Sequence, residues 1–340
     1  MVLNKTLHLG RKLMPNRIDI KENDILELNP SLLGLLLKDM TTGKNILWGT
    51  DNYEKLGDGY KQTDQIQREL ITGENGEVIK PRIAKSKEEQ TLRSKTKAEV
   101  FTPSWVCNAQ NNLIDEAWFG RKDVFNIEGD KTWEPNLEPI KFTKKKGKTW
   151  EYYVKANRME VSCGEAPYLV SRYDTITGDA IPLNRRIGLL DRKLRVVSEN
   201  CDTERDWSRH AEIAMQSVYG FEWQGDNLLL AREAMLYTFI ENYELKFGKR
   251  PLAASIKYIA YIVSWNIWQM DGLKGVVPNS CKDTISPSLF GDDIKTPCKG
   301  CADGGYYNHT GIYCLIKDWR AKDPQTNKLG KKIRFIDLFK

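Results

Sequence analysis

The chain has 340 residues, a formal net charge of +6 and 40% hydrophobic residues. This length is typical of one large or two ordinary globular domains, and the composition is not that of a disordered chain. No apolar run approaches the ~20 residues of a membrane helix, and no secretion signal opens the chain, so we expect a cytoplasmic protein without a membrane partner. Seven cysteines in such a chain favour free thiols or a metal site over disulfides. The mild positive charge is compatible with a nucleic-acid partner.

Residues 1–95 are predicted to form an N-terminal α+β leader region. Within it, 30–37 has the composition of a short buried helix, 41–44 that of a turn and 45–49 that of a strand. The basic stretch 80–97 has two interpretations, a solvated helix or linker, or an arm that contacts phosphates.

The middle of the chain alternates between helix and strand patterns. Thr102 is a plausible N-cap, with Pro103 in the first turn of the helix that follows. Residues 121–150 form a charged insertion that contains tryptophan. Apolar spacing then predicts helices over 185–199, 204–218 and 227–247, a strand over 219–223, and a helix leading into a strand over 256–268.

The stretch 158–170 is the most informative part of the sequence. It has the pattern of a short strand, a tight glycine turn and a helix, with Glu160 at the end of the strand. In doubly wound α/β sheets, a nucleotide-like cofactor lies in the crevice at such strand ends. A carboxylate there suits a cationic or hydroxyl-bearing ligand better than a phosphate, which favours S-adenosylmethionine (SAM) over a dinucleotide.

Two further acids follow in the same order. Glu222 closes the strand over 219–223, and Asp271 closes the segment 266–271. In a SAM pocket the first turn lies near the methionine part, the second acid accepts hydrogen bonds from the ribose hydroxyls, and the third accepts from the adenine amino group. Each acid alone also suits an ordinary strand-end or turn position, but the ordered set predicts one shared SAM pocket.

Four segments resemble the adenine-N6 DNA methyltransferases of bacterial restriction–modification systems, especially proteins labelled restriction endonuclease subunit M. The segments are Lys97-Ala-Glu-Val-Phe-Thr-Pro103, Met159-Glu-Val-Ser-Cys-Gly-Glu-Ala-Pro-Tyr-Leu169, 220–233 and 266–273. The resemblance implies a Rossmann-like α/β methyltransferase fold over residues 96–280. It also implies that SAM is bound by Phe101, Thr102, Pro103, Glu160, Ser162, Cys163, Gly164, Glu222, Trp223 and Asp271.

The chain departs from this family in two ways. Val161 replaces the proline of the glycine-turn signature, and Ala166 with Pro167 replaces its second glycine. The family's catalytic Asn/Asp-Pro-Pro-Tyr/Phe loop, which stacks on a flipped base, has no counterpart, because the chain contains no Pro-Pro pair. We therefore assign no catalytic residue, and we expect an incomplete sheet that a second chain with the catalytic loop completes. The strand-like run 332–338 would supply the open edge, unless it pairs with 311–318 as a closed hairpin.

The region 281–340 is rich in cysteine and glycine, and we expect it to be a hairpin insertion. Cys281, Cys298, Cys301 and Cys314 have spacing suited to a tetrahedral structural zinc site, with His309 as an alternative ligand in place of Cys281. The other interpretation is free thiols in a loop.

Together these features predict a SAM-binding subunit of a site-specific bacterial DNA adenine-N6 methyltransferase that is inactive without its partner subunit. The alternative is a degenerate, non-catalytic DNA-binding or specificity protein that uses the basic stretches 80–97 and 144–146. A nuclease is a third possibility, but its only acid-x-Lys pair, Glu244 and Lys246, falls on a predicted helix where a nuclease needs a strand.

Overall fold

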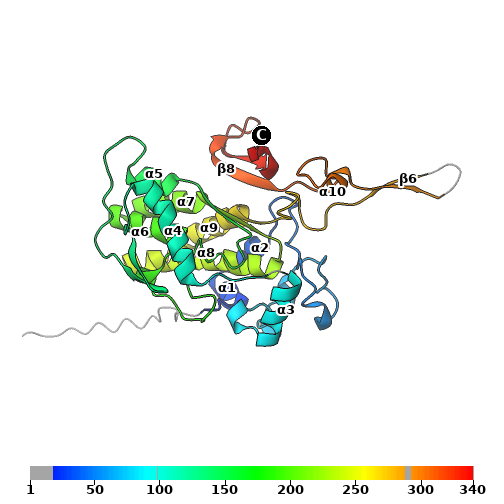
Figure 1. Cartoon of the computed structure of the whole chain (residues 1–340), viewed down its shortest axis with the longest axis horizontal. Helices are drawn as coiled ribbons and strands as arrows, with labels where there is room; N and C mark the ends of the chain where they lie inside the picture. The colour runs from blue at the N-terminus through cyan, green and yellow to red at the C-terminus, as the bar shows by residue number, and fades with distance from the viewer. Residues whose placement is uncertain (1–17, 98, 288–291, 340) are drawn as a thin grey trace, which may run out of the picture.

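The computed structural model describes residues 18–97, 99–287 and 292–339 (Figure 1). Its centre is a parallel sheet in the order β3 (Arg158–Val161), β4 (Val218–Glu222) and β5 (Ile267–Gln269). The other sheets of the described part are two-stranded, and none closes into a barrel. The protein is therefore a mixed α/β structure with small sheets, as expected at that level.

Helices make the crossovers that parallel strands require. α6 (Leu189–Asn200) and α7 (Glu204–Gln216) join β3 to β4, while α8 (Gly225–Phe247) and α9 (Ala253–Asn266) join β4 to β5. These elements lie close to their predicted bounds. The helix expected directly after the glycine turn does not form, because 163–169 is a series of turns and the next α-helix begins at Leu189.

The N-terminal region contains α1 (Glu22–Leu28), α2 (Pro30–Leu36), α3 (Lys87–Lys97) and the short 3-10 helices η1 (Glu54–Leu56), η2 (Arg68–Leu70), η3 (Gly73–Asn75) and η4 (Arg82–Ala84). Asn29 caps α2, since its side chain accepts a hydrogen bond from the backbone N–H of Ser31. The strand expected over 45–49 is reduced to isolated bridges, such as the one between Leu47 and Gln65. Fully buried residues of this region, including Leu32 and Trp48, belong to the same core as α8 and α9.

Next come α4 (Ser104–Phe119), a hairpin of β1 (Asn126–Gly129) and β2 (Thr132–Pro135), α5 (Trp150–Lys155) and, after β3, the 3-10 helix η5 (Leu183–Arg185). The prediction that Thr102 caps α4 is wrong. The N-cap is Pro103, which has no side-chain acceptor, and the backbone N–H of Ser104 instead donates to Asp174 at 2.9 Å.

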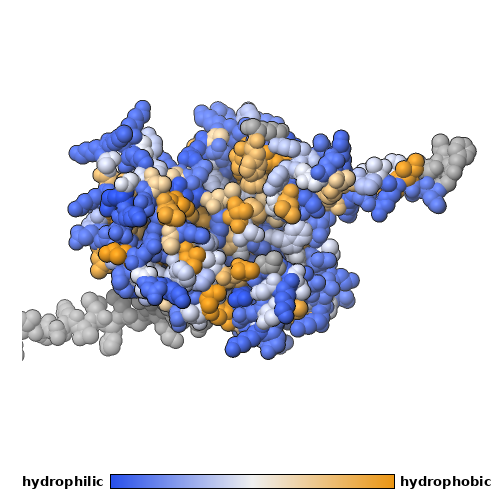
Figure 2. Space-filling model, in the orientation of Figure 1, coloured by the Kyte–Doolittle hydropathy of each residue, from blue (hydrophilic) through white to orange (hydrophobic). Residues whose placement is uncertain are grey.

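The C-terminal region contains β6 (Thr284–Ser286), β7 (Ile294–Thr296), α10 (Lys299–Asp303), β8 (Leu315–Lys322), β9 (Leu329–Arg334) and the 3-10 helix η6 (Phe335–Phe339). β6 and β7 pair in a ribbon that projects from the body beyond α10, and this ribbon is mostly hydrophilic (Figures 1 and 2). β8 and β9 pair antiparallel. The run 332–338 is therefore divided between a strand of this hairpin and η6, which agrees with the alternative of a hairpin with 311–318.

The β8–β9 hairpin covers one face of the parallel sheet. Phe221 and Trp268 of the sheet pack with Phe335 in a small separate core, whereas Val218 belongs to the main core on the helical side. This division follows from the alternation of side chains along β4. No helix in the described part is both long enough and apolar enough to cross a membrane.

Candidate functional site

A cavity of about 280 Å³ lies where β3 and β4 end. Because both strands run in parallel, their carboxyl ends open at the same edge of the sheet. Seven of the residues that the sequence predicted to bind a cofactor line this cavity: Phe101, Thr102, Glu160, Ser162, Cys163, Gly164 and Glu222.

Glu160 lies in the wall of this cavity, with one carboxylate oxygen unused. Its Oε1 accepts a long hydrogen bond of 3.5 Å from the backbone N–H of Tyr168, while the buried Oε2 has no partner. Burial raises the pKa of Glu160 well above its ordinary value. A buried acceptor without a partner is costly, so the site is suited to a ligand that donates a hydrogen bond or carries positive charge.

Glu222 uses both oxygens to hold the local backbone. Its Oε2 accepts from the N–H of Gly164 at 2.9 Å, and its Oε1 accepts from the N–H of Gln224 at 3.1 Å. Burial raises the pKa of this carboxyl too. Glu222 therefore fixes the glycine turn relative to the start of α8.

The turn itself requires unusual backbone conformations. Ser162, Gly164 and Ala166 have φ values of 57°, 52° and 62°, in the left-handed region that favours glycine. Ala166 occupies the place where the resembled signature has its second glycine, so the chain keeps the glycine conformation without the glycine. Such strained residues cluster at functional sites in proteins.

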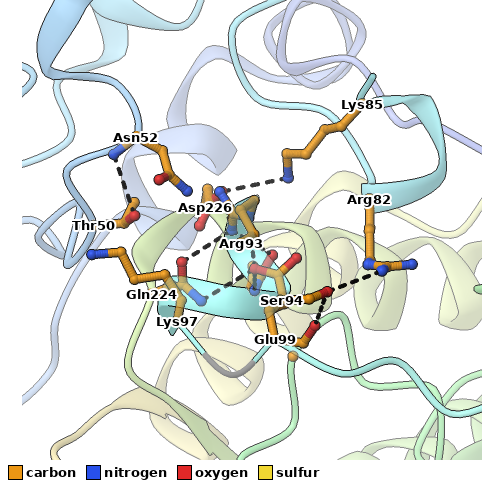
Figure 3. A network of polar contacts seen from close by, with 12 residues as sticks. Thr50, Asn52, Arg82, Lys85, Arg93, Ser94, Lys97, Glu99, Gln224 and Asp226 are labelled. Carbon is orange, nitrogen blue, oxygen red and sulfur yellow. Dashed lines mark hydrogen bonds and ion pairs between the residues drawn. The ribbon is translucent and has the colours of Figure 1, made fainter. Parts of the chain in front are cut away.

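Glu99 is a third buried acid at this cavity that the sequence reasoning missed. Its Oε2 accepts from Arg93 Nε at 2.6 Å, from Gln224 Nε2 at 3.2 Å and from Asn227 Nδ2 at 3.3 Å, while its Oε1 is buried without a partner (Figure 3). Its only sequence signal was its place two residues before Phe101, in a segment already assigned to the pocket.

Three predicted residues lie outside the cavity lining. Pro103 is the N-cap of α4, and the Trp223 indole donates to the carbonyl of Gly49 at 2.7 Å. Asp271 closes a local turn, since its Oδ1 accepts from the N–H of Leu273 and its Oδ2 pairs with Lys274 at 3.2 Å. The expectation that Glu160, Glu222 and Asp271 face one space therefore fails for Asp271. β5 ends at Gln269, two residues before Asp271, so Asp271 lies in the turn that follows the strand and not at the strand end.

Comparisons with protein-family models, curated proteins and solved structures find no match to this chain.

A group that could hold a metal ion lies where the β6–β7 ribbon meets the body. The ligand atoms of Cys281, Cys298, Cys301 and His309 all lie within 4.8 Å of one another. The Nδ1 atom of His309 is 3.5 Å from the sulfur of Cys281 and 3.7 Å from those of Cys298 and Cys301. Three of the predicted cysteines and His309 thus form one cluster, in which His309 joins Cys281 instead of replacing it.

The surroundings of this cluster orient its ligands. The Nε2 atom of His309 lies 2.7 Å from the carbonyl of Gly305, a contact that leaves Nδ1 as the metal-facing nitrogen. The Thr310 side chain and backbone N–H lower the pKa of the Cys298 thiol to about 5. A thiol with a low pKa is ready to act as a metal ligand.

Cys314, predicted as a ligand, does not belong to the cluster. It is fully buried in the small core with Phe221 and Trp268, and its sulfur contacts the carbonyl of Gln269 at 3.4 Å. The residue comes directly before β8 and is carried with that strand onto the sheet.

Proposed function

We propose that this chain is the SAM-binding subunit of a bacterial DNA adenine-N6 methyltransferase, with a Rossmann-like fold that a second chain completes. The observation that supports it is a cavity at two parallel strand ends with three buried carboxyl groups, two of which have unpartnered oxygens. SAM carries a sulfonium, an ammonium group and two ribose hydroxyls, and it would supply the activated methyl group. Free carboxylate oxygens are suitable acceptors for such groups.

The roles of the residues follow from their contacts. Glu160 and Glu99 would accept hydrogen bonds from the ligand through their free oxygens. Glu222 would act by positioning the turn at Gly164, since both of its oxygens are already used. Phe101 would close the cavity next to that turn. Its ring lies 3.9 Å from the position that a Cβ atom would occupy if residue 164 were not glycine.

The partner that carries the catalytic loop would add to β3. This strand pairs with β4 on one side, and among the described residues no strand pairs with its other side. The side chains of Met159 and Val161, on one face of this strand, are 42% and 65% exposed. An edge of this kind is a template for another strand, so we place the partner and its DNA at β3 instead of at the chain terminus. The alternative function, a non-catalytic DNA-binding protein, would use the same fold without SAM.

We assign the cluster of Cys281, Cys298, Cys301 and His309 to structural zinc. A tetrahedral zinc ion with bonds of about 2.3 Å to sulfur and about 2.0 Å to nitrogen separates these atoms by about 3.5 Å. The three sulfur–nitrogen distances of 3.5–3.7 Å fit this value. All four positions of the tetrahedron are filled by protein atoms, which suits a structural role better than catalysis.

Calorimetric titration with SAM tests the cofactor proposal. The protein should bind SAM, alone or together with the polypeptide encoded beside it, and Glu160→Gln should weaken binding by about ten-fold or more. Glu88→Gln, on the exposed face of α3, is the matched control and should bind as the parent does. The proposal fails if the protein binds SAM neither alone nor with that polypeptide. It also fails if Glu160→Gln binds SAM as tightly as the parent does. DNA binding without any SAM binding would favour the alternative.

A further inference from the structure

A second cavity, of about 460 Å³, lies beside the first and shares none of its lining residues. Its walls come from the N-terminal region, namely 52–56, 77–80 and 84–93. The residues proposed to bind SAM do not line this second cavity.

The wall of this cavity carries more positive than negative charge. It has four cations, Lys55, Lys80, Lys85 and Arg93, against the two acids Glu77 and Glu89. Glu77 is already neutralised, since its Oε2 pairs with Lys21 at 2.8 Å, outside the cavity, and with Lys80 at 3.4 Å.

The other charged side chains of the wall differ in whether they already have a partner within the protein. Glu89 is exposed and accepts from the backbone N–H of Ser86 at 3.0 Å. Arg93 is occupied by Glu99 and Asp226, at 2.6 and 2.9 Å. Lys55, by contrast, has no carboxylate within ion-pair distance among the described side chains, so its charge is available to a ligand.

Lys85 is the most unusual of these cations. Its side chain is only 7% exposed, yet its Nζ atom makes no hydrogen bond within the protein. It lies 3.5 Å from Asp226 Oδ2, but that oxygen already accepts from Arg93 at 2.9 Å and from the Tyr53 hydroxyl at 2.8 Å. A buried ammonium with unused donors is costly unless an acceptor reaches it.

Asn52 provides a second unused donor in the same wall. Its Nδ2 is buried without a partner, and its backbone N–H is held by Thr50 Oγ1 at 3.4 Å. Figure 3 shows that Asn52 and Lys85 come from two different segments of the chain, with Lys85 directed toward Asp226. Two residues that each carry a buried donor without a hydrogen-bond partner, Asn52 and Lys85, thus line the same cavity as Lys55 and Lys80.

We propose that this cavity binds a phosphate group. Lys85 Nζ and Asn52 Nδ2 would donate to its oxygens, and Lys55 and Lys80 would add charge. A phosphate offers several acceptor oxygens and up to two negative charges to one group of donors, which matches unused donors on separate segments. The group could belong to a small phosphorylated ligand or to the backbone of a nucleic acid, and these share the same chemistry.

Titration calorimetry with inorganic phosphate, a nucleoside 5′-monophosphate and a duplex DNA of arbitrary sequence distinguishes the two sources. Saturable binding of either small probe identifies a small phosphorylated ligand, whereas binding of the duplex alone identifies a nucleic-acid backbone. In either case Lys85→Gln should weaken binding by about ten-fold or more. Lys61→Gln, an exposed lysine outside the cavity, makes the same change in charge and should leave the affinity unchanged.

Lys55→Gln is a second variant, for the case in which loss of the buried Lys85 charge unfolds the protein. Lys55 is exposed and has no ion-pair partner among the described residues, so its replacement should leave the fold intact. It should weaken binding of the same probe by several-fold. The proposal is overturned if none of the three probes binds, or if Lys61→Gln weakens binding as much as Lys55→Gln does. SAM titration of these variants keeps the two proposals separate, because retained SAM affinity with lost phosphate affinity assigns them to different cavities.

Discussion

Arg93 and Glu99, six residues apart and both buried, form an ion pair of 2.6 Å that ties α3 to the cavity proposed for SAM. The same guanidinium pairs with Asp226 at 2.9 Å, in the first turn of α8. Arg93 therefore stands between the two cavities and neutralises a carboxylate on each side. Its hydrogen bonds also reach Gln224 Oε1 at 3.1 Å (Figure 3).

Arg93→Ala should lower the free energy of unfolding by about 3–5 kcal/mol, because it leaves Glu99 and Asp226 buried without their main partner. Urea unfolding followed by circular dichroism measures this change. Arg209→Ala, an exposed arginine on α7, should cost less than about 1 kcal/mol. An equal loss of unfolding free energy in the two variants would contradict a stabilising role for the buried network of Arg93.

Removal of a single cluster ligand should release the zinc. Cys298→Ser and His309→Ala should each lower the zinc content of the purified protein well below one ion per chain, measured by inductively coupled plasma mass spectrometry. Cys314→Ala should retain full zinc, since that sulfur faces the sheet core. Zinc loss in Cys314→Ala with retention in His309→Ala would restore the four-cysteine set.

SAM affinity should rise with pH. Burial holds the pKa of Glu160 well above its ordinary value, so the free protein keeps this group protonated over a wide pH range. A cationic ligand prefers the ionised carboxylate, and binding should therefore release a proton. Titrations in buffers of different ionisation enthalpy detect that proton. In Glu160→Gln the release should disappear; its persistence there would assign the proton to another group.

Stability should fall as pH rises from about 5 to about 8. Burial raises the pKa of Glu22 from 4.5 to about 8, and burial with the nearby Glu22 charge raises that of Glu233. Neither oxygen of the fully buried Glu233 has a hydrogen-bond partner. The folded state thus binds more protons than the unfolded state above pH 4.5, and stability is lost through this window.

Glu233→Gln should reduce this loss, which we expect to be on the order of 1–3 kcal/mol, because glutamine cannot ionise. Thermal unfolding at the two pH values measures it. Glu27→Gln, an exposed acid on the same helix as Glu22, should leave the pH dependence as it is. A flat profile in the parent protein would contradict the assignment.

The long apolar elements at the centre of the molecule were predictable from the sequence. The strand ending at Glu222 and the long α8 match their patterns because both are buried over most of their length. The helix expected after Gly164 does not form, because contacts with two acids hold the segment in turns. Gly164 donates to Glu222, which is distant in the chain, and Tyr168 donates to Glu160, on the other side of the turn.

The site could be predicted only where neighbours in sequence are also neighbours in space. Spacing along the chain identified Cys298 and Cys301. It offered His309 only in place of Cys281, whereas in the structure His309 takes the place of Cys314, which lies next to β8 on the sheet. Burial of Lys85 and Arg93 was equally hidden. A lysine-rich stretch has the same pattern whether it is solvated or, as here, folded over a buried acid.

The small core beneath the β8–β9 hairpin has a practical consequence for anyone who shortens this protein. The cysteine-rich region is not a removable appendage as a whole, since Phe335 covers Phe221 and Trp268 of the central sheet. Excision of 282–308 with a short linker would spare that cover, whereas truncation before residue 314 would expose an aromatic sheet face and yield an aggregating product.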